Sequence, residues 1–306
     1  MNKLTIKVPG STANLGPGFD SIGLAVNLYL RVEAVRSERW EFSYETPGFE
    51  SIPTNEDNLI YKAAQFTAKQ KGMTDELPAH HVTVTCELPL ASGLGSSAAA
   101  IVAGIELADQ LLALSLSKQE KARIASLYEG HPDNVAASVY GGLVIATHHE
   151  DETFVVESGT PELDMVIMIP NQELLTSESR DVLPTTLTFQ ASTRASSVAN
   201  VLVASLLKGD VRTAGKMMRK DLFHQPYREK IVPDLPVISA FGEEKGIEGV
   251  ALSGAGPSIM CYTNVGKGAE ALQTLQAAFP VYQCRLLQPA KEGSTVTVVN
   301  ETFSKK

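Results

Sequence analysis

Cysteine is scarce in this chain of 306 residues, which has three: Cys86, Cys261 and Cys284. They are far apart in the sequence, and no two of them form a CxxC pair. An odd number of widely spaced cysteines does not support a disulfide framework or a zinc site. We interpret them as small buried hydrophobic residues of a protein in a reducing compartment.

Positive charge is also in short supply, because 26 Lys and Arg residues are outnumbered by 35 Asp and Glu residues, for a formal net charge of −9. A general nucleic-acid or anionic-membrane surface needs a basic face, so we expect neither partner. The most apolar run, Ala98 to Leu116, has Glu106 and Asp109 near its middle, where charges are costly in lipid, and it predicts a core helix. Met1 to Val8 alternates like a strand and not like a secretory signal, which favours a cytoplasmic protein.

A lysine is missing from the glycine-rich stretch Pro89 to Ala100, which excludes a Walker A loop. The stretch follows an alternating segment typical of a strand, His81 to Leu88, and precedes an Ala/Leu/Ile-rich helical segment. Gly93 and Gly95 allow positive φ and close backbone approach, while two serine hydroxyls lie beside the first free amides of the helix. This combination predicts an anion site, with phosphate as the preferred anion.

A dinucleotide fingerprint is the nearest alternative, because Gly93-x-Gly95-x-x-Ala98 fits its relaxed form. That motif requires a second strand ending in an acid about 20 residues further on. Here Ser117 and Glu120 instead form a capping box ahead of another helix, which argues against a nicotinamide site. A small-residue turn that only packs a helix on a sheet is the simpler structural alternative.

The remaining patterns predict mixed strands and helices without regular βαβ alternation, and therefore an α+β architecture. A strand is expected over Ala25 to Val35, with Trp40 to Glu45 as its hairpin partner. Asp57 or Asn58 is expected to cap a helix that begins near residue 59. The acidic stretch Glu150 to Pro161 is expected to form a hairpin and to cross to a second domain.

Three glycine-bearing segments, in order, resemble the galactokinase, homoserine kinase, mevalonate kinase and phosphomevalonate kinase (GHMP) superfamily. They are Asn14 to Asp20, Pro89 to Ala99 and Leu252 to Ser258. Within the superfamily, the sequence from Ala13 to Leu24 and the motif His131-Pro132-Asp133-Asn134-Val135-Ala136 resemble the homoserine kinase branch, as does Arg228 near Pro226.

The resemblance implies two domains: residues 1–158 as an ATP-binding domain of the ribosomal-protein-S5-like type, and residues 159–306 as a ferredoxin-like domain. It also implies transfer of the ATP γ-phosphoryl group to the side-chain hydroxyl of L-homoserine, giving O-phospho-L-homoserine in threonine biosynthesis. A homodimer is a further expectation. The alternatives are another GHMP kinase, acting on mevalonate or a sugar, and a non-catalytic metabolite sensor on the same fold.

The resemblance also assigns roles to individual residues. The nucleotide is expected to contact Pro89, Leu90, Ala91, Ser92, Gly93, Leu94, Gly95, Ser96, Ser97, Ala98 and Ala99. Asn55, which reads as a helix cap, is added as an adenine contact. Mg²⁺ is expected on Ser97 and Glu129. L-homoserine is expected to contact Asn14, Asp20, His131, Asn134, Thr176, Arg180 and Arg228, while Asp133 is read as structural.

Catalysis is assigned to Asn134, Asp20 and Ser97. Because the amide of Asn134 cannot accept a proton at neutral pH, we expect it to place the substrate hydroxyl for in-line attack. Asp20 is the one nearby candidate for proton acceptor, and we rank binding of the substrate ammonium group above that role.

Overall fold

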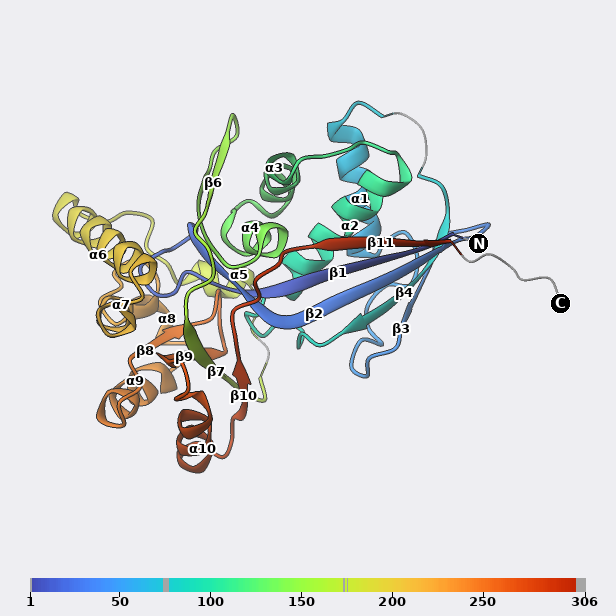
Figure 1. Ribbon diagram of the computed structural model, residues 1–306. Coiled ribbons are helices and arrows are strands. Elements are labelled where there is room, and N and C mark those ends of the chain that lie inside the picture. Colours follow the sequence, from blue (N-terminus) through green and yellow to red (C-terminus); the bar gives the residue numbers. More distant parts are fainter. Residues whose placement is uncertain (1, 74–76, 173, 175, 301–306) are drawn as a thin grey trace.

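The computed structural model describes residues 2–73, 77–172, 174 and 176–300, and these form two sheets with their helices (Figure 1). Among the described residues, seven strands build the first sheet and four the second. The predicted α+β class is confirmed. The seven strands of the first sheet are β1 (Asn2–Ala13), β2 (Ile22–Arg36), β3 (Glu41–Tyr44), β4 (His80–Cys86), β5 (Leu143–His148), β6 (Thr153–Glu157) and β11 (Thr295–Asn300).

The first sheet has the order β11-β1-β2-β4-β3, with β5 paired to β2 and to β6. Its helices α1 (Leu59–Gln70), α2 (Ser96–Leu111), α3 (Lys118–Glu129) and α4 (Asp133–Tyr140) gather on one side of it (Figure 1). Asn58 caps α1 by accepting a hydrogen bond from the Ile60 amide, and the predicted capping box of Ser117 and Glu120 begins α3. Close packing of α1 on α2 depends on Gly104, where a Cβ would lie 2.3 Å from the Ile60 carbonyl oxygen.

The second sheet is antiparallel, in the order β10-β7-β9-β8. Its strands are β7 (Leu163–Ile169), β8 (Gly249–Leu252), β9 (Ile259–Asn264) and β10 (Gln283–Leu287). The helices of this half are α5 (Thr176–Asp181), α6 (Phe189–Leu207), α7 (Val211–Met218), α8 (Gln225–Arg228), α9 (Asp234–Glu244) and α10 (Gly268–Ala278).

Strands β3 and β11 pair in ways that were not predicted from the sequence, whereas the hairpin of β5 and β6 was predicted. The hairpin partner predicted for β2 was wrong, because β3 pairs in parallel with β4, and β4 occupies the edge of β2 from Leu30 to Arg36. The hairpin in the acidic stretch is confirmed as β5 and β6. The last strand, β11, returns to pair with β1, so the range predicted for the second domain includes a strand of the first sheet. The boundary at residues 158 and 159 stays a prediction.

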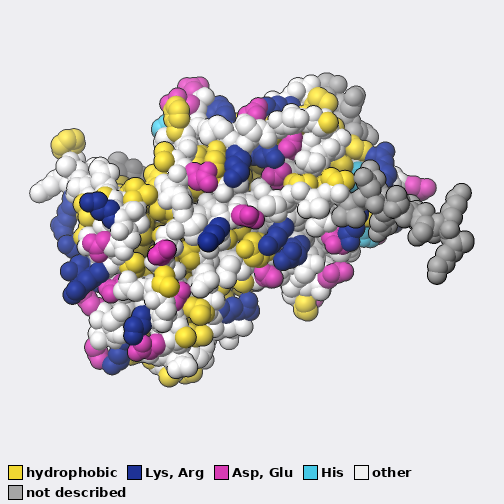
Figure 2. All heavy atoms as spheres, viewed as in Figure 1, with side chains coloured by type: hydrophobic (Ala, Val, Ile, Leu, Met, Phe, Trp, Pro, Cys, Tyr) yellow, Lys and Arg dark blue, Asp and Glu magenta, His cyan; other side chains and the backbone are white. Residues whose placement is uncertain are grey.

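Within the described part of the chain, no helix is long and apolar enough to cross a membrane. Cys86 and Cys261 are buried, Cys284 is partly exposed, and all three are free thiols. On the face seen in Figure 2, Lys and Arg side chains are interspersed with Asp and Glu side chains.

A buried charge cluster joins α2 to α3. Glu106 and Asp109 are 3% and 5% exposed, and the Lys121 ammonium lies 2.7 Å and 2.8 Å from their carboxylates. Ser294, just before β11, donates a 2.6 Å hydrogen bond to Glu106. Burial lowers the pKa of Lys121, but the hydrogen bonds to Asp109 and Glu106 outweigh it and leave the pKa raised. The cluster therefore holds two acids in the core through one cation.

Replacing Lys121 with alanine should destabilise the fold by about 3–5 kcal/mol, because it leaves two buried carboxylates without their cation. Urea unfolding at neutral pH measures the loss. Lys62→Ala is the matched control: its pair with Asp57 is exposed, so its removal should cost less than about 1 kcal/mol. Equal losses for the two variants would contradict a buried role for Lys121.

Candidate active site

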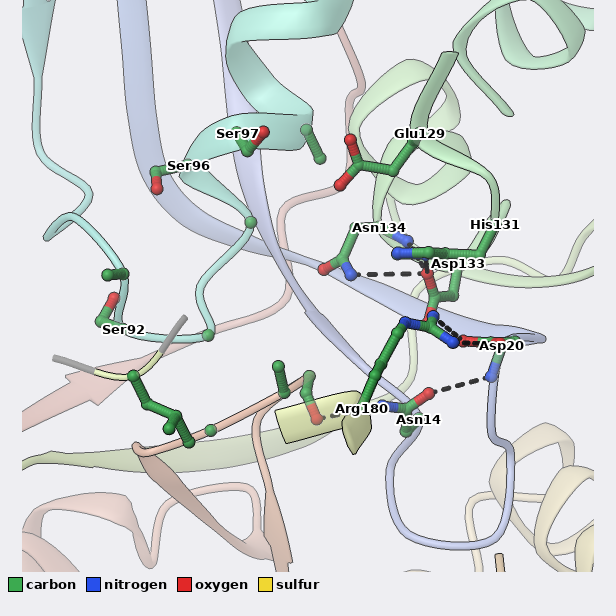
Figure 3. Close-up of a pocket in the computed structure, with 18 of the residues that line it drawn as sticks. Asn14, Asp20, Ser92, Ser96, Ser97, Glu129, His131, Asp133, Asn134 and Arg180 are labelled. Carbon is green, nitrogen blue, oxygen red and sulfur yellow. Dashed lines mark hydrogen bonds and ion pairs between the residues drawn. The ribbon is translucent and has the colours of Figure 1, made fainter. Parts of the chain in front are cut away.

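A cavity of about 230 Å³ lies where the two halves of the molecule meet (Figure 3). Six parts of the chain reach it: the β1–β2 loop, the glycine turn before α2, the junction of α3 and α4, helix α5 with Leu174 just before it, helix α8, and the turn between β8 and β9. Segments more than 200 residues apart in sequence thus form one wall; for example, the Asn14 side chain donates to the Gly254 carbonyl across 240 residues.

One end of the cavity is the N-terminus of α2. Gly95 is the N-cap residue with φ of +69°, and it has no side chain to cap the first amides of the helix. Gly93 also has positive φ, and a Cβ there would lie 2.1 Å from the Ser253 carbonyl oxygen. The uncapped amides, together with the Ser96 and Ser97 hydroxyls that line the cavity, provide a site for an anion.

The opposite end holds a buried cation, Arg228, which is 1% exposed. Its Nε donates to the Ser179 carbonyl at 3.0 Å, and its Nη1 donates to the Gly254 carbonyl and to His224 Nδ1. All of these acceptors are neutral, and no described carboxylate forms an ion pair with this guanidinium. Burial, followed by the nearby charge of Arg180, lowers the pKa of Arg228 to about 10, so the group stays charged at neutral pH.

Asp20 and Arg180 face one another beside Arg228. The guanidinium of Arg180 donates to both carboxylate oxygens of Asp20, at 2.7 Å and 3.1 Å (Figure 3). Asn14 fixes the loop by accepting from the Asp20 amide. Arg180 and Arg228 both lie over the Phe19 ring, with guanidinium carbons 5.4 Å and 5.5 Å from its centre. The structure thus brings together an acid and two arginines that the sequence analysis assigned to one substrate.

The start of α4 supplies a hydrogen-bonded set on the wall between the two ends. His131 Nδ1 lies 2.6 Å from Asp133 Oδ1, and the same oxygen accepts from the Asn134 amide. The Ser11 hydroxyl donates to Asn134 Oδ1 at 2.9 Å. Burial lowers the pKa of His131, but the Asp133 hydrogen bond and charge outweigh it and leave the pKa raised. The set fixes the orientation of Asn134.

The predicted metal ligands Ser97 and Glu129 both line the cavity, on the side of the α2 N-terminus (Figure 3). Burial raises the pKa of Glu129, and its carboxylate forms no hydrogen bond or ion pair that ties it to another described residue. A second group, Asp20, His131 and Asp133, also brings ligand atoms within 4.8 Å of one another. Asp20 is already bound by Arg180, which leaves Glu129 as the freer acid.

The residues predicted for the nucleotide fall into four groups. Those that line the cavity are Ala91, Ser92, Gly93, Gly95, Ser96, Ser97 and Ala98. Pro89 and Leu90 line a neighbouring cavity, while Leu94 and Ala99 are buried in the core. Asn55 borders a separate surface hollow by α1, and its side chain accepts from the Asp57 amide.

The residues predicted for the substrate all belong to the cavity wall except Thr176, which begins α5 and whose side chain lies outside the described residues. Two parts of the cavity wall were not among the predicted site residues: Phe19 lies under both arginines, and the turn from Gly254 to Gly256 closes the cavity. The third glycine segment was the available signal for this turn. Asp133, which was read as structural, joins His131 to Asn134.

Two domains of known proteins match this chain, one in each half of the molecule. Residues 58–142 match the N-terminal domain of GHMP kinases, and residues 202–281 match the C-terminal domain. The fold and these two matches define the chain as a GHMP kinase, as predicted.

Relatives within this class are more specific. The chain is 50% identical to a homoserine kinase from Shouchella clausii over 96% of its own length and 98% of that protein, and 50% identical to one from Bacillus velezensis over 95% and 94%. The crystal structure of homoserine kinase from Cytophaga hutchinsonii superposes with a TM-score of 0.83 at 26% identity, covering 96% of this chain and 97% of that one. The chain belongs to the homoserine kinase family.

Proposed function

We propose that this enzyme transfers the γ-phosphoryl group of ATP to the side-chain hydroxyl of L-homoserine and releases O-phospho-L-homoserine, a step of threonine biosynthesis. The observation that carries the proposal is Arg228, a buried cation at the cavity wall whose hydrogen bonds all go to neutral acceptors. A buried charge needs an opposite charge, and here the substrate supplies it as a carboxylate.

The pair of Asp20 and Arg180 supports a zwitterionic substrate. The planar fork of an arginine suits a carboxylate, and an aspartate suits an ammonium group. Both are present within one wall, next to Arg228. We propose that the substrate ammonium group shares Asp20 with Arg180, while Arg228 takes the substrate carboxylate. Mevalonate and sugars lack the ammonium group and would leave Asp20 without that partner.

ATP is assigned to the end of the cavity at α2. We propose that the triphosphate lies against the turn from Ser92 to Ser97, where the amides of α2 are uncapped. The neighbouring cavity of about 350 Å³ has polar groups from Ser92, Asn171, Gln172 and Ser258, and an apolar part that suits the nucleobase, formed by Pro47, Phe49, Pro89, Leu90, Ile169 and Pro170. This position replaces Asn55 as the site proposed for adenine.

Mg²⁺ suits Ser97 and Glu129, because hydroxyl and carboxylate oxygens are hard ligands and because Glu129 lacks a described partner of its own. When bound, the ion would neutralise charge on the transferred phosphoryl group. The cytoplasm is the proposed compartment, and the homodimer remains a prediction.

Coupled measurement of ADP tests the activity. We expect turnover with L-homoserine, and a value of kcat/KM for L-serine lower by roughly 10- to 200-fold, because serine is one methylene shorter. Mevalonate and galactose should give no ADP above the background hydrolysis. A higher rate with mevalonate or galactose would assign a different GHMP kinase activity, and ATP binding without any turnover would assign a sensor.

Arg228→Ala should raise KM for L-homoserine by about 30-fold or more, because it removes a buried charged contact worth roughly 2–5 kcal/mol. KM for ATP should change little. Arg228→Lys keeps the charge without the fork and should lose less, and Arg194→Ala, at an exposed site on α6, is the control. An unchanged KM for L-homoserine in Arg228→Ala would place the substrate elsewhere.

Glu129→Gln should raise the Mg²⁺ concentration needed for half-maximal activity by roughly tenfold or more, because it removes the charge of a proposed ligand. The measurement is a Mg²⁺ titration of the rate at fixed ATP and L-homoserine. Glu157→Gln, at an exposed position on β6, should leave the titration unchanged. If both variants titrate alike, Glu129 is not a ligand.

A further inference from the structure

His224 is a buried residue behind the cavity wall, and no role has been assigned to it so far. It is 0% exposed and lies one residue before α8, four positions before Arg228. Its ring stacks on Phe19 at 5.3 Å between centroids. It therefore lies between the β1–β2 loop and the helix that carries Arg228.

The hydrogen bonds of His224 define one tautomer. Nδ1 lies 3.0 Å from Arg228 Nη1, and since a guanidinium can only donate, Nδ1 must be the unprotonated acceptor. Nε2 lies 2.8 Å from the Gly16 carbonyl oxygen and 3.3 Å from Asp221 Oδ2, so it must carry the proton. Burial also lowers the pKa of His224, which is consistent with a neutral ring.

The surrounding contacts hold the ring in place. Asp221 Oδ2 accepts from the amides of His224 and Gln225 and so fixes the start of α8. The Gln225 side chain in turn donates to the Met218 carbonyl and accepts from the Leu252 amide. The imidazole thus has a fixed position from which Nδ1 meets Arg228.

We propose that His224 is a positioning residue for substrate recognition: its Nδ1 holds the Arg228 guanidinium in the orientation that binds the substrate carboxylate, while its Nε2 ties α8 to the β1–β2 loop. The inference rests on the proposed function, because it presumes that Arg228 binds that carboxylate. With Nε bound to Ser179 and Nη1 bound to Gly254 and His224, Nη2 is the nitrogen whose N–H groups are left for the substrate carboxylate.

Two substitutions separate the two halves of this role. The amide of Asn in His224→Asn reaches the place of Nδ1 and can still accept from Arg228. The amide of Gln in His224→Gln reaches the place of Nε2, where it can donate to Gly16 or Asp221 but leaves Arg228 without an acceptor in place of Nδ1. We expect His224→Gln to raise KM for L-homoserine about tenfold or more, because a buried charged donor loses its acceptor. His224→Asn should stay within about threefold of the wild type. In both variants kcat and KM for ATP should change less than KM for L-homoserine.

A substrate without the carboxylate provides the readout that a merely structural role would not move. With 2-aminobutane-1,4-diol, in which a hydroxymethyl group replaces the carboxylate, the two variants should have the same KM. In wild-type enzyme, ¹⁵N NMR of the His224 ring should report a neutral imidazole protonated at Nε2, and this measurement does not depend on either variant folding.

Equal KM values of His224→Asn and His224→Gln for L-homoserine, or a ring protonated at Nδ1, would overturn the inference. Arg228→Ala, assayed in parallel, separates this failure from that of the proposed function. If Arg228→Ala raises KM for L-homoserine but His224→Gln does not, only the role of His224 is wrong. If Arg228→Ala has no effect, the proposed substrate pocket is wrong and the role of His224 fails with it.

Discussion

The centre of this molecule depends on a buried positive charge, Arg228, whose hydrogen bonds all go to neutral groups. The Arg228 guanidinium is buried and hydrogen bonds to backbone carbonyls and an imidazole. These neutral acceptors stabilise a guanidinium less than a carboxylate does. The carboxylates that act on Arg228 do so without an ion pair: Asp20 is bound by Arg180 and Asp133 by His131, while Asp221 lies behind the His224 ring, 3.3 Å from Nε2. The free site therefore has a built-in preference for an anionic ligand, and the uncapped end of α2 has the same preference at the other end of the cavity.

The two ends of the cavity that favour an anion, the N-terminus of α2 and Arg228, are held at a fixed separation by contact between two glycine turns. Ser253 donates to the Gly93 carbonyl at 2.7 Å, and the Gly254 amide donates to the Ala13 carbonyl. The Gly254 carbonyl accepts from both Asn14 and Arg228. A Cβ on Gly93 would collide with the Ser253 backbone, so the approach requires glycine there. Positioning of this kind is what phosphoryl transfer demands, since alignment contributes much of its catalysis.

Local features of the fold could be predicted from the sequence because their causes are local. A strand, a glycine turn and an uncapped helix follow one another between His80 and Leu111, and the capping box of α3 spans four residues. The partners of the charged side chains could not be predicted in this way. Asp20 and Arg180 are 160 residues apart, and only the tertiary fold decides that they neutralise one another. Resemblance singled out the arginines, but no local signal distinguished them from the other arginines of the chain.

His224 illustrates a further limit. Its sequence neighbours give no sign of chemistry, because its role depends on Gly16, more than 200 residues away, and on the tautomer that two buried contacts impose. The parallel pairing of β3 was missed for a related reason: the strand that displaces it from β2 lies almost 40 residues further on. In both cases the deciding contact is remote in sequence.

The hydrogen bonds around Asn134 also bear on the fate of the substrate proton under the proposed function. Ser11 donates to Oδ1, and the amide nitrogen, which can only donate, keeps one N–H free among the described residues, beside its 3.4 Å hydrogen bond to Asp133 Oδ1. Asn134 would therefore bind the oxygen of the attacking hydroxyl and orient it without removing its proton. Asp20 is poorly placed to act as the base instead, because both of its oxygens already accept from Arg180. The arrangement favours a reaction driven by alignment and charge neutralisation, in which the proton leaves the hydroxyl after the phosphoryl group has begun to transfer.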